Sequence, residues 1–180
     1  SALYDYQLDA TDHVDPRFHD VGVVLLDRPI TLPRYPRLAT APVKAGTRVL
    51  NVGRMLDGRL TNAAYGANSE IQDASRHGHP NAYASQVVIQ QGDSGGPDFV
   101  AGTHELVAVN SGASTTVQLL ARVDLVSSWL QQQIAQNGGS GPTWPEATPT
   151  DADAAPSPPT SPPPDAAWVC SGTPERESND

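Results

Sequence analysis

The segment Gly92-Asp93-Ser94-Gly95-Gly96-Pro97 decides how this chain of 180 residues is interpreted. A serine hydroxyl is a weak nucleophile until a base removes its proton, and the oxyanion formed on attack needs hydrogen-bond donors already in place. Glycines on both sides of Ser94 allow a sharp turn that exposes the hydroxyl and directs backbone N–H groups to one point. A bare Gly-Asp-Ser-Gly string would also suit an ordinary β-turn, but the full string predicts a nucleophile.

Upstream, an aspartate leads into an apolar run, His19-Asp20-Val21-Gly22-Val23-Val24-Leu25-Leu26. The run is nearly continuous and is stopped by Asp27-Arg28-Pro29, which predicts a short buried strand. A carboxylate at the start of such a strand can accept a hydrogen bond from a histidine ring and stabilise the imidazolium. An aspartate here is also a common strand-start residue, so its interpretation depends on the serine segment that follows.

The rest of the body has the pattern of a β protein closed by one helix. Strand-like runs cover residues 47–52, 84–89 and 106–109, with glycine and polar residues between them, which indicates an antiparallel barrel or sandwich. In residues 123–134 the apolar side chains fall three and four apart, and Asp124 stands at an N-cap position. This last segment therefore predicts an amphipathic helix.

Together, the serine segment and the aspartate-led strand resemble the chymotrypsin/trypsin family of serine proteases, in which the aspartate also precedes the serine. The resemblance implies that Ser94 is the nucleophile and that Asp20 orients a catalytic histidine. It also implies an oxyanion hole formed by the backbone N–H groups of Gly92 and Ser94. Asp93 matches the carboxylate that, in many members, pairs with the α-amino terminus released on activation.

The resemblance extends to the substrate-binding region. Val109-Asn110-Ser111-Gly112 resembles the strand that pairs with the substrate backbone and forms one wall of the specificity pocket. Val88 stands where members that prefer Arg or Lys carry an aspartate, so a cationic P1 side chain would be left unpaired. We therefore expect a preference for apolar or small uncharged P1 residues. The expected substrate-binding residues are Val88, Gln91, Asn110, Ser111 and Gly112.

The histidine of the family is missing from the sequence. The histidines are His13, His19, His77, His79 and His104, and none stands in the small-residue Ala-Ala-His context of the family. His19 adjoins Asp20, and neighbours on an extended strand point to opposite faces. The pair in His77-Gly78-His79-Pro80 is a weak metal signal without further ligands, and a polar surface loop is the preferred interpretation. We expect no metal site, and a chain that is a fragment lacking its catalytic base.

These features predict an all-β fold, a trypsin-like double antiparallel β-barrel with an incomplete first barrel and a C-terminal α-helix. Residues 1–40 would be the remaining part of the first barrel, and residues 41–138 the second barrel with its helix. Residues 139–166 are proline-rich and predict a disordered linker. Residues 167–180 would begin a further module that is cut short.

Composition limits the partners. The net charge is −9, but much of the excess lies in the tail, and the body is nearly balanced. This gives no reason to expect nucleic acid as a partner. No apolar run approaches the length of a membrane span. The single Cys170 leaves the body without an internal disulfide, which looks more like some secreted bacterial members than like animal digestive ones.

The sequence thus predicts a serine endopeptidase that needs no cofactor, acts on proteins or peptides through an acyl-enzyme, and is a secreted monomer open to protein inhibitors. This fragment alone would be inactive because the histidine is absent. The alternative is a catalytically inactive homologue that serves as a protein-binding module. Truncation is favoured because Asp20, Ser94 and the glycines are intact while a whole stretch is missing.

Overall fold

The computed structural model describes residues 1–11, 13–15, 17–75 and 78–137. The predicted linker at 139–166 and the predicted module at 167–180 lie outside these residues. Within the described part of the chain, no helix is both long and apolar enough to cross a membrane.

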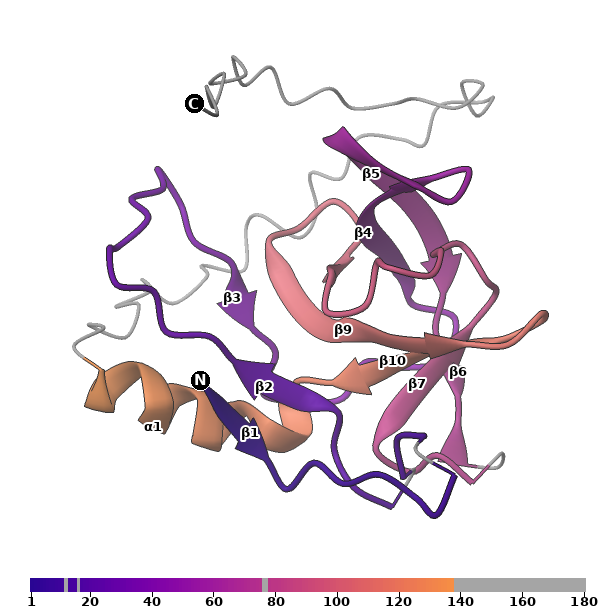
Figure 1. Cartoon of the computed structure of the whole chain (residues 1–180), viewed down its shortest axis with the longest axis horizontal. Coiled ribbons are helices and arrows are strands. Elements are labelled where there is room, and N and C mark those ends of the chain that lie inside the picture. The colour runs from indigo at the N-terminus through magenta and orange to yellow at the C-terminus, as the bar shows by residue number, and fades with distance from the viewer. Residues whose placement is uncertain (12, 16, 76–77, 138–180) are drawn as a thin grey trace, which may run out of the picture.

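Most of the strands form one curved sheet (Figure 1), which follows the order β5-β4-β8-β9-β10-β7-β6, with β3 added beside β9. Every pairing is antiparallel except that of β3 with β9. The strands are β3 (Arg37–Leu38), β4 (Arg48–Leu56), β5 (Arg59–Glu70), β6 (Gln72–Asp73), β7 (Ala82–Ser85), β8 (Pro97–Val100), β9 (Glu105–Ala113) and β10 (Gln118–Arg122).

The longest hairpin of this sheet is specified locally. Strands β4 and β5 are joined by Asp57 and Gly58, whose φ angles are 48° and 72°. Two consecutive positive φ angles match the right-handed twist of a hairpin, and an Asp-Gly pair adopts them readily. The register pairs Leu56 with Arg59 directly across this turn.

The interior of the sheet has an apolar and a polar part. The apolar part contains Val49, Ile71, Tyr83, Val107 and Leu120, all buried. Burial of such side chains is the main source of stability in a domain of this size. The buried polar side chains of the sheet include Asn51, Ser69, Asp98, Asn110 and Gln118.

One buried polar chain runs across β5, β4 and β8. The Ser69 hydroxyl donates to Asn51 Oδ1 at 2.7 Å, and Asn51 Nδ2 donates in turn to Asp98 Oδ1. Asp98 is fully buried, and its Oδ2 has no hydrogen-bond partner among the described residues. Burial raises the pKa of Asp98 to about 8, although the Asn51 hydrogen bond opposes this shift.

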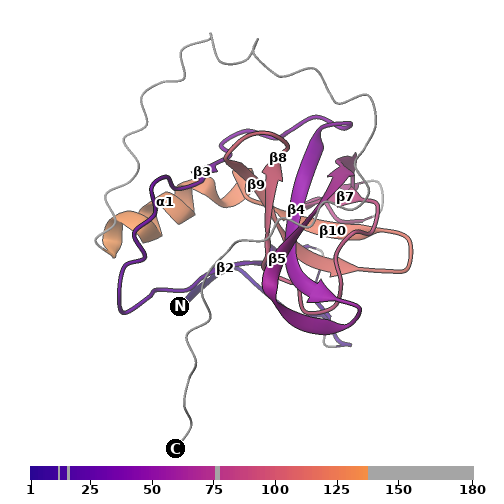
Figure 2. The same ribbon diagram turned by 90° about the horizontal axis from the view of Figure 1, so that it is seen from above.

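A smaller layer packs beside the curved sheet (Figure 2). Strands β1 (Ala2–Tyr4) and β2 (Val21–Val23) pair with each other, and helix α1 (Ser127–Gln136) follows a single turn of 3₁₀ helix at Asp124–Val126. The rings of Tyr4 and Trp129 lie 5.4 Å apart, which ties β1 to α1. The second apolar cluster consists of Val21, Ala121, Val123, Val126 and Leu130.

The all-β architecture with a C-terminal helix confirms the predicted fold class, but two predicted strands are shorter than expected. The buried strand expected over residues 21–26 ends at Val23, and Val24 to Leu26 are exposed. In the described residues β2 has only β1 as a partner, so no layer covers its continuation. The strand expected over residues 84–89 ends at Ser85, because the N–H groups of Val88 and Ile89 bond to a side chain instead.

The helix predicted over residues 123–134 is present but starts later. Its N-cap position is Val126, with no side-chain hydrogen bond to the helix terminus. Asp124, the expected cap, instead forms an ion pair with Arg122 at 2.6 Å. The division of residues 1–40 and 41–138 into two barrels stays a prediction.

Candidate active site

The nucleophile segment lies in the loop between β7 and β8. Gly92 and Gly95 have φ angles of 103° and 82°, which L-residues with a side chain rarely adopt, and Ser94 between them is exposed. The loop is held from below by β9, because Gly95 N–H donates to the Asn110 carbonyl at 2.7 Å. Asn110 N–H donates to the Gly96 carbonyl at 2.8 Å. The turn that the glycines predicted therefore forms.

Asp93 anchors this loop to strand β4. Its side chain is 6% exposed, and Oδ1 accepts hydrogen bonds from the N–H groups of Arg54 and Met55 at 2.8 and 2.9 Å. Oδ2 accepts a third from Gln90 N–H at 3.0 Å. Three backbone donors satisfy a buried carboxylate well. The pairing of Asp93 with an α-amino group stays a prediction, and the carboxylate already has these partners without one.

The close approach of Asp93 depends on a glycine in β4. A Cβ atom on Gly53 would overlap the carboxyl group of Asp93. We expect Gly53→Ala to lower the free energy of unfolding by about 1–3 kcal/mol, because the loop anchor must shift. Gly112→Ala is the matched control, since a Cβ on this strand glycine meets no atom within 4 Å. Urea unfolding curves of both variants measure the effect. Equal unfolding midpoints for Gly53→Ala and Gly112→Ala would contradict the expectation.

The expected oxyanion-hole donors, the N–H groups of Gly92 and Ser94, belong to the same turn. Among the described residues, the N–H groups of Gly92 and Ser94 donate no hydrogen bond, unlike those of their neighbours Asp93, Gly95 and Gly96. Donors that are fixed and unused can stabilise negative charge as it develops.

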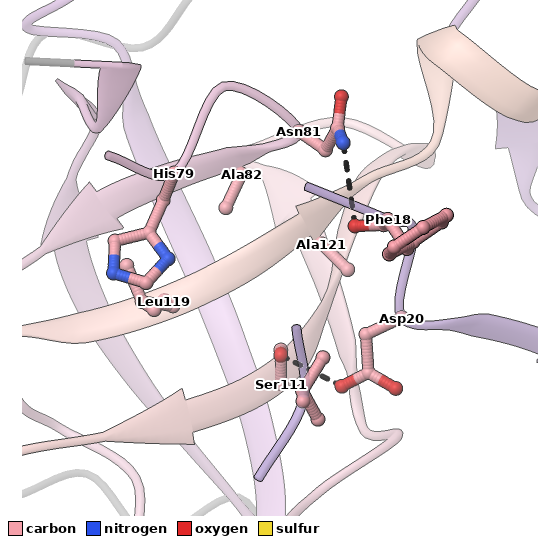
Figure 3. A pocket seen from close by; sticks show the side chains of 9 residues that line it. Phe18, Asp20, His79, Asn81, Ala82, Ser111, Leu119 and Ala121 are labelled. Atoms are coloured by element: carbon pink, nitrogen blue, oxygen red, sulfur yellow. Dashed lines mark hydrogen bonds between the residues drawn. The ribbon is translucent and has the colours of Figure 1, made fainter. Parts of the chain in front are cut away.

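Asp20 and Ser94 are linked through Ser111 of β9. The Ser111 hydroxyl donates to Asp20 Oδ2 at 2.7 Å, and the Ser94 hydroxyl donates to the Ser111 carbonyl at 3.5 Å. Figure 3 shows the first of these contacts at the start of β2. Ser111 was expected to contact substrate, and its bond to Asp20 was not foreseen, because no local pattern indicates which residue a strand serine meets across the sheet.

Asp20 and Ser111 line a small open pocket (Figure 3). Its other lining residues are Val14, Phe18, His79, Asn81, Ala82, Leu119 and Ala121. The wall is held together by Asn81 Nδ2, which donates to the Phe18 carbonyl at 3.3 Å. His79 and Asp20 lie on opposite sides of the pocket. His79 is half-buried in this wall, while its neighbours Gly78 and Pro80 are exposed, and the interpretation of residues 77–80 as a polar surface loop stays a prediction.

No described histidine is placed as the general base between Asp20 and Ser94 by the contacts it makes. His19 Nδ1 bonds to Asp5 Oδ1 at 2.9 Å, and its ring packs edge-on against Tyr4. This agrees with the expectation that His19 points away from the site. His77 lies outside the described residues. The described residues contain no group of three side chains able to hold a metal ion.

The other residues that were expected to bind substrate differ in how far they are buried. Gln91 is exposed, and Val88 and Gly112 are half-buried. Asn110 is buried beneath the nucleophile loop, where its Nδ2 lies 3.2 Å from both the Val52 and the Asp93 carbonyl oxygens. The Asn110 side chain therefore supports the loop from inside.

This architecture is that of the chymotrypsin/trypsin-like serine proteases. A mutant of human heparin binding protein (CAP37) has a TM-score of 0.51 and 22% identity, over 77% of this chain and 67% of that chain. The scabies mite inactivated protease paralogue S-I1 has a TM-score of 0.49 and 21% identity, over 62% of this chain and 59% of its own. The VesB protease of Vibrio cholerae has a TM-score of 0.49 and 20% identity, over 59% and 37%. Neither a protein-family model nor a curated protein sequence matches the chain.

Proposed function

We propose that this chain is the larger part of a serine endopeptidase domain. The observation that carries the proposal is the chain of contacts between three distant segments: the exposed Ser94 donates from its hydroxyl to the Ser111 backbone carbonyl, and the Ser111 hydroxyl donates to Asp20. Asp20 would orient a histidine base, and Ser94 would attack the scissile carbonyl.

The reaction would proceed in two halves. The base takes the proton of Ser94 as its oxygen attacks the carbonyl carbon, and the oxyanion is stabilised by the N–H groups of Gly92 and Ser94. The base then returns the proton to the leaving amine, which leaves an acyl-enzyme that water hydrolyses by the reverse sequence. We propose that the histidine comes from outside the 180 residues, because none of the five histidines stands in the Ala-Ala-His context of the family.

The substrates of such an enzyme would be proteins or peptides, and protein inhibitors would bind the same face. The family resemblance implies a secreted enzyme that acts as a monomer. Both assignments belong to the proposal.

The test is covalent labelling of the full-length protein with a fluorophosphonate probe, followed by peptide mass mapping. Ser94 is expected to be labelled, and Ser94→Ala to abolish labelling. Ser128→Ala is the matched control, because Ser128 is exposed on α1, away from the loop. Residues 1–180 alone are expected to remain unlabelled, because a serine without its base loses most of its reactivity.

A second candidate is an inactive homologue that binds proteins. The observation favouring it is that no described histidine contacts Ser94 or Asp20. If the folded full-length protein does not react with the probe, the serine endopeptidase proposal is wrong and the inactive binding homologue takes its place.

A further inference from the structure

Gln118, at the start of β10, is a fully buried polar side chain that the proposed mechanism does not use. Its Oε1 accepts hydrogen bonds from two successive backbone groups, Val88 N–H at 2.8 Å and Ile89 N–H at 3.2 Å. The Gln118 side chain thus accepts the backbone hydrogen bonds of residues 88–89, as a neighbouring strand does elsewhere in the sheet. Removing it would leave two N–H groups without these partners.

These contacts place Gln118 between the two segments that border the reactive serine. One is residues 88–91, which lead directly into the nucleophile loop. The other is the end of β9, where the Ser111 carbonyl lies 3.5 Å from Ser94 Oγ. The register pairs Gln118 with Ala113 of that strand, next to the pair of Leu119 with Gly112. Gln118 therefore spans from β9 and β10 to residues 88–89.

Under the proposed function, the family resemblance implies that a substrate attacked by Ser94 places its P1 side chain between these same segments. Protein interiors are close-packed, so space taken by a buried side chain is not open to a ligand. Gln118 Nε2 is buried as well and has no hydrogen-bond partner among the described residues, which shows that the amide is enclosed on all sides. The space beside residues 88–89 that Gln118 occupies is therefore closed to a substrate side chain.

We infer that Gln118 closes the P1 pocket and restricts cleavage to positions after small residues such as glycine, alanine and serine. This inference rests on the proposed function and sharpens it, since the sequence alone allowed large apolar residues too. Gln118 would also fix the backbone of residues 88–89. Its side chain would thus have two separate effects: it fills the P1 pocket, and it positions the segment that leads into the nucleophile loop.

The test uses the full-length protein and two peptidyl diphenyl phosphonates that differ only in carrying alanine or phenylalanine at P1. Ser94 Oγ displaces one phenoxide from phosphorus, and the second-order rate of inactivation measures access to the pocket. We expect the wild-type protein to react with the alanine probe about 10–200-fold faster, the range that a pocket of fixed size can give. Gln118→Ala should reduce or reverse this preference.

Gln118→Met separates the two effects, because methionine has a similar volume but accepts hydrogen bonds poorly. This variant should keep the preference for alanine and react more slowly with both probes. Gln131→Ala, on the exposed face of α1, is the matched control and should leave both rates unchanged.

The outcomes distinguish the inference from the proposed function. If wild-type protein reacts with both probes at similar rates, or faster with the phenylalanine probe, the inference is wrong and the serine protease remains. If neither probe reacts while the protein is folded, the proposed function fails and the inference fails with it. If Gln118→Ala does not fold, the inference is still tested by the ratio of the two inactivation rates in the wild-type protein and in Gln118→Met.

Discussion

Replacing Asp98 by asparagine in the full-length protein is expected to raise the free energy of unfolding by on the order of 4 kcal/mol at pH 8. Burial raises the pKa of this carboxyl from 3.8 to about 8. Between these two values the folded state holds a proton that the unfolded state has released. The contribution of Asp98 to stability is therefore expected to fall as the pH rises from about 4 to about 8, and then to level off. Asparagine has the same shape but cannot ionise, so the variant should lack this decline.

Urea denaturation, followed by tryptophan fluorescence from pH 4.5 to pH 9, measures the effect. Near pH 4.5 the two proteins should differ less, because a protonated Asp98 and an asparagine are both neutral and both place an unpartnered donor group, one O–H or one NH2, at the position of Oδ2. Asp27→Asn is the matched control, since Asp27 is exposed. A variant whose stability runs parallel to that of the wild type across the whole range would show that Asp98 is already ionised in the folded protein.

The parts of the fold that the sequence predicted are those specified by short-range pattern. The glycines around Ser94 require a turn, and that turn forms with positive φ at Gly92 and Gly95. The three-and-four spacing before residue 134 predicted α1, and alternation predicted the start of β4. In each case the residues that determine the structure lie within about one turn or one strand of each other.

The parts that the sequence did not predict depend on partners far along the chain. An apolar run predicts burial only if a second layer exists, and the described residues provide none beyond Val23. The sequence around Gln118, at the start of β10, gives no sign that its side chain will accept the hydrogen bonds of residues 88–89. Likewise, nothing near Asp93 indicates that its donors come from Arg54 and Met55 of β4. Such contacts follow from topology, which local pattern does not determine.

Asp20 offers the second large expected effect, which rests on the proposed function. Asp20→Asn in the full-length protein should lower kcat by about 10⁴-fold near neutral pH, because an amide in place of the carboxylate favours the wrong tautomer of the histidine. Ser111 now donates a hydrogen bond to Asp20 Oδ2 at 2.7 Å, and the amide of asparagine can still accept it through its oxygen. The fold should therefore persist while activity is lost.

The rate on a chromogenic peptide ester with alanine at P1, compared with urea unfolding of the same samples, separates chemistry from stability. Asp27→Asn removes an exposed carboxylate and should change neither quantity. Ser111→Ala deletes the hydroxyl that orients Asp20 but leaves the charge of Asp20. The kcat of this variant should therefore lie between those of the wild type and Asp20→Asn. A folded Asp20→Asn protein with activity within about tenfold of the wild type would remove Asp20 from the catalytic group, because a carboxylate that stabilises an imidazolium contributes far more than that. Ser94 would then have to act with a base that needs no aspartate.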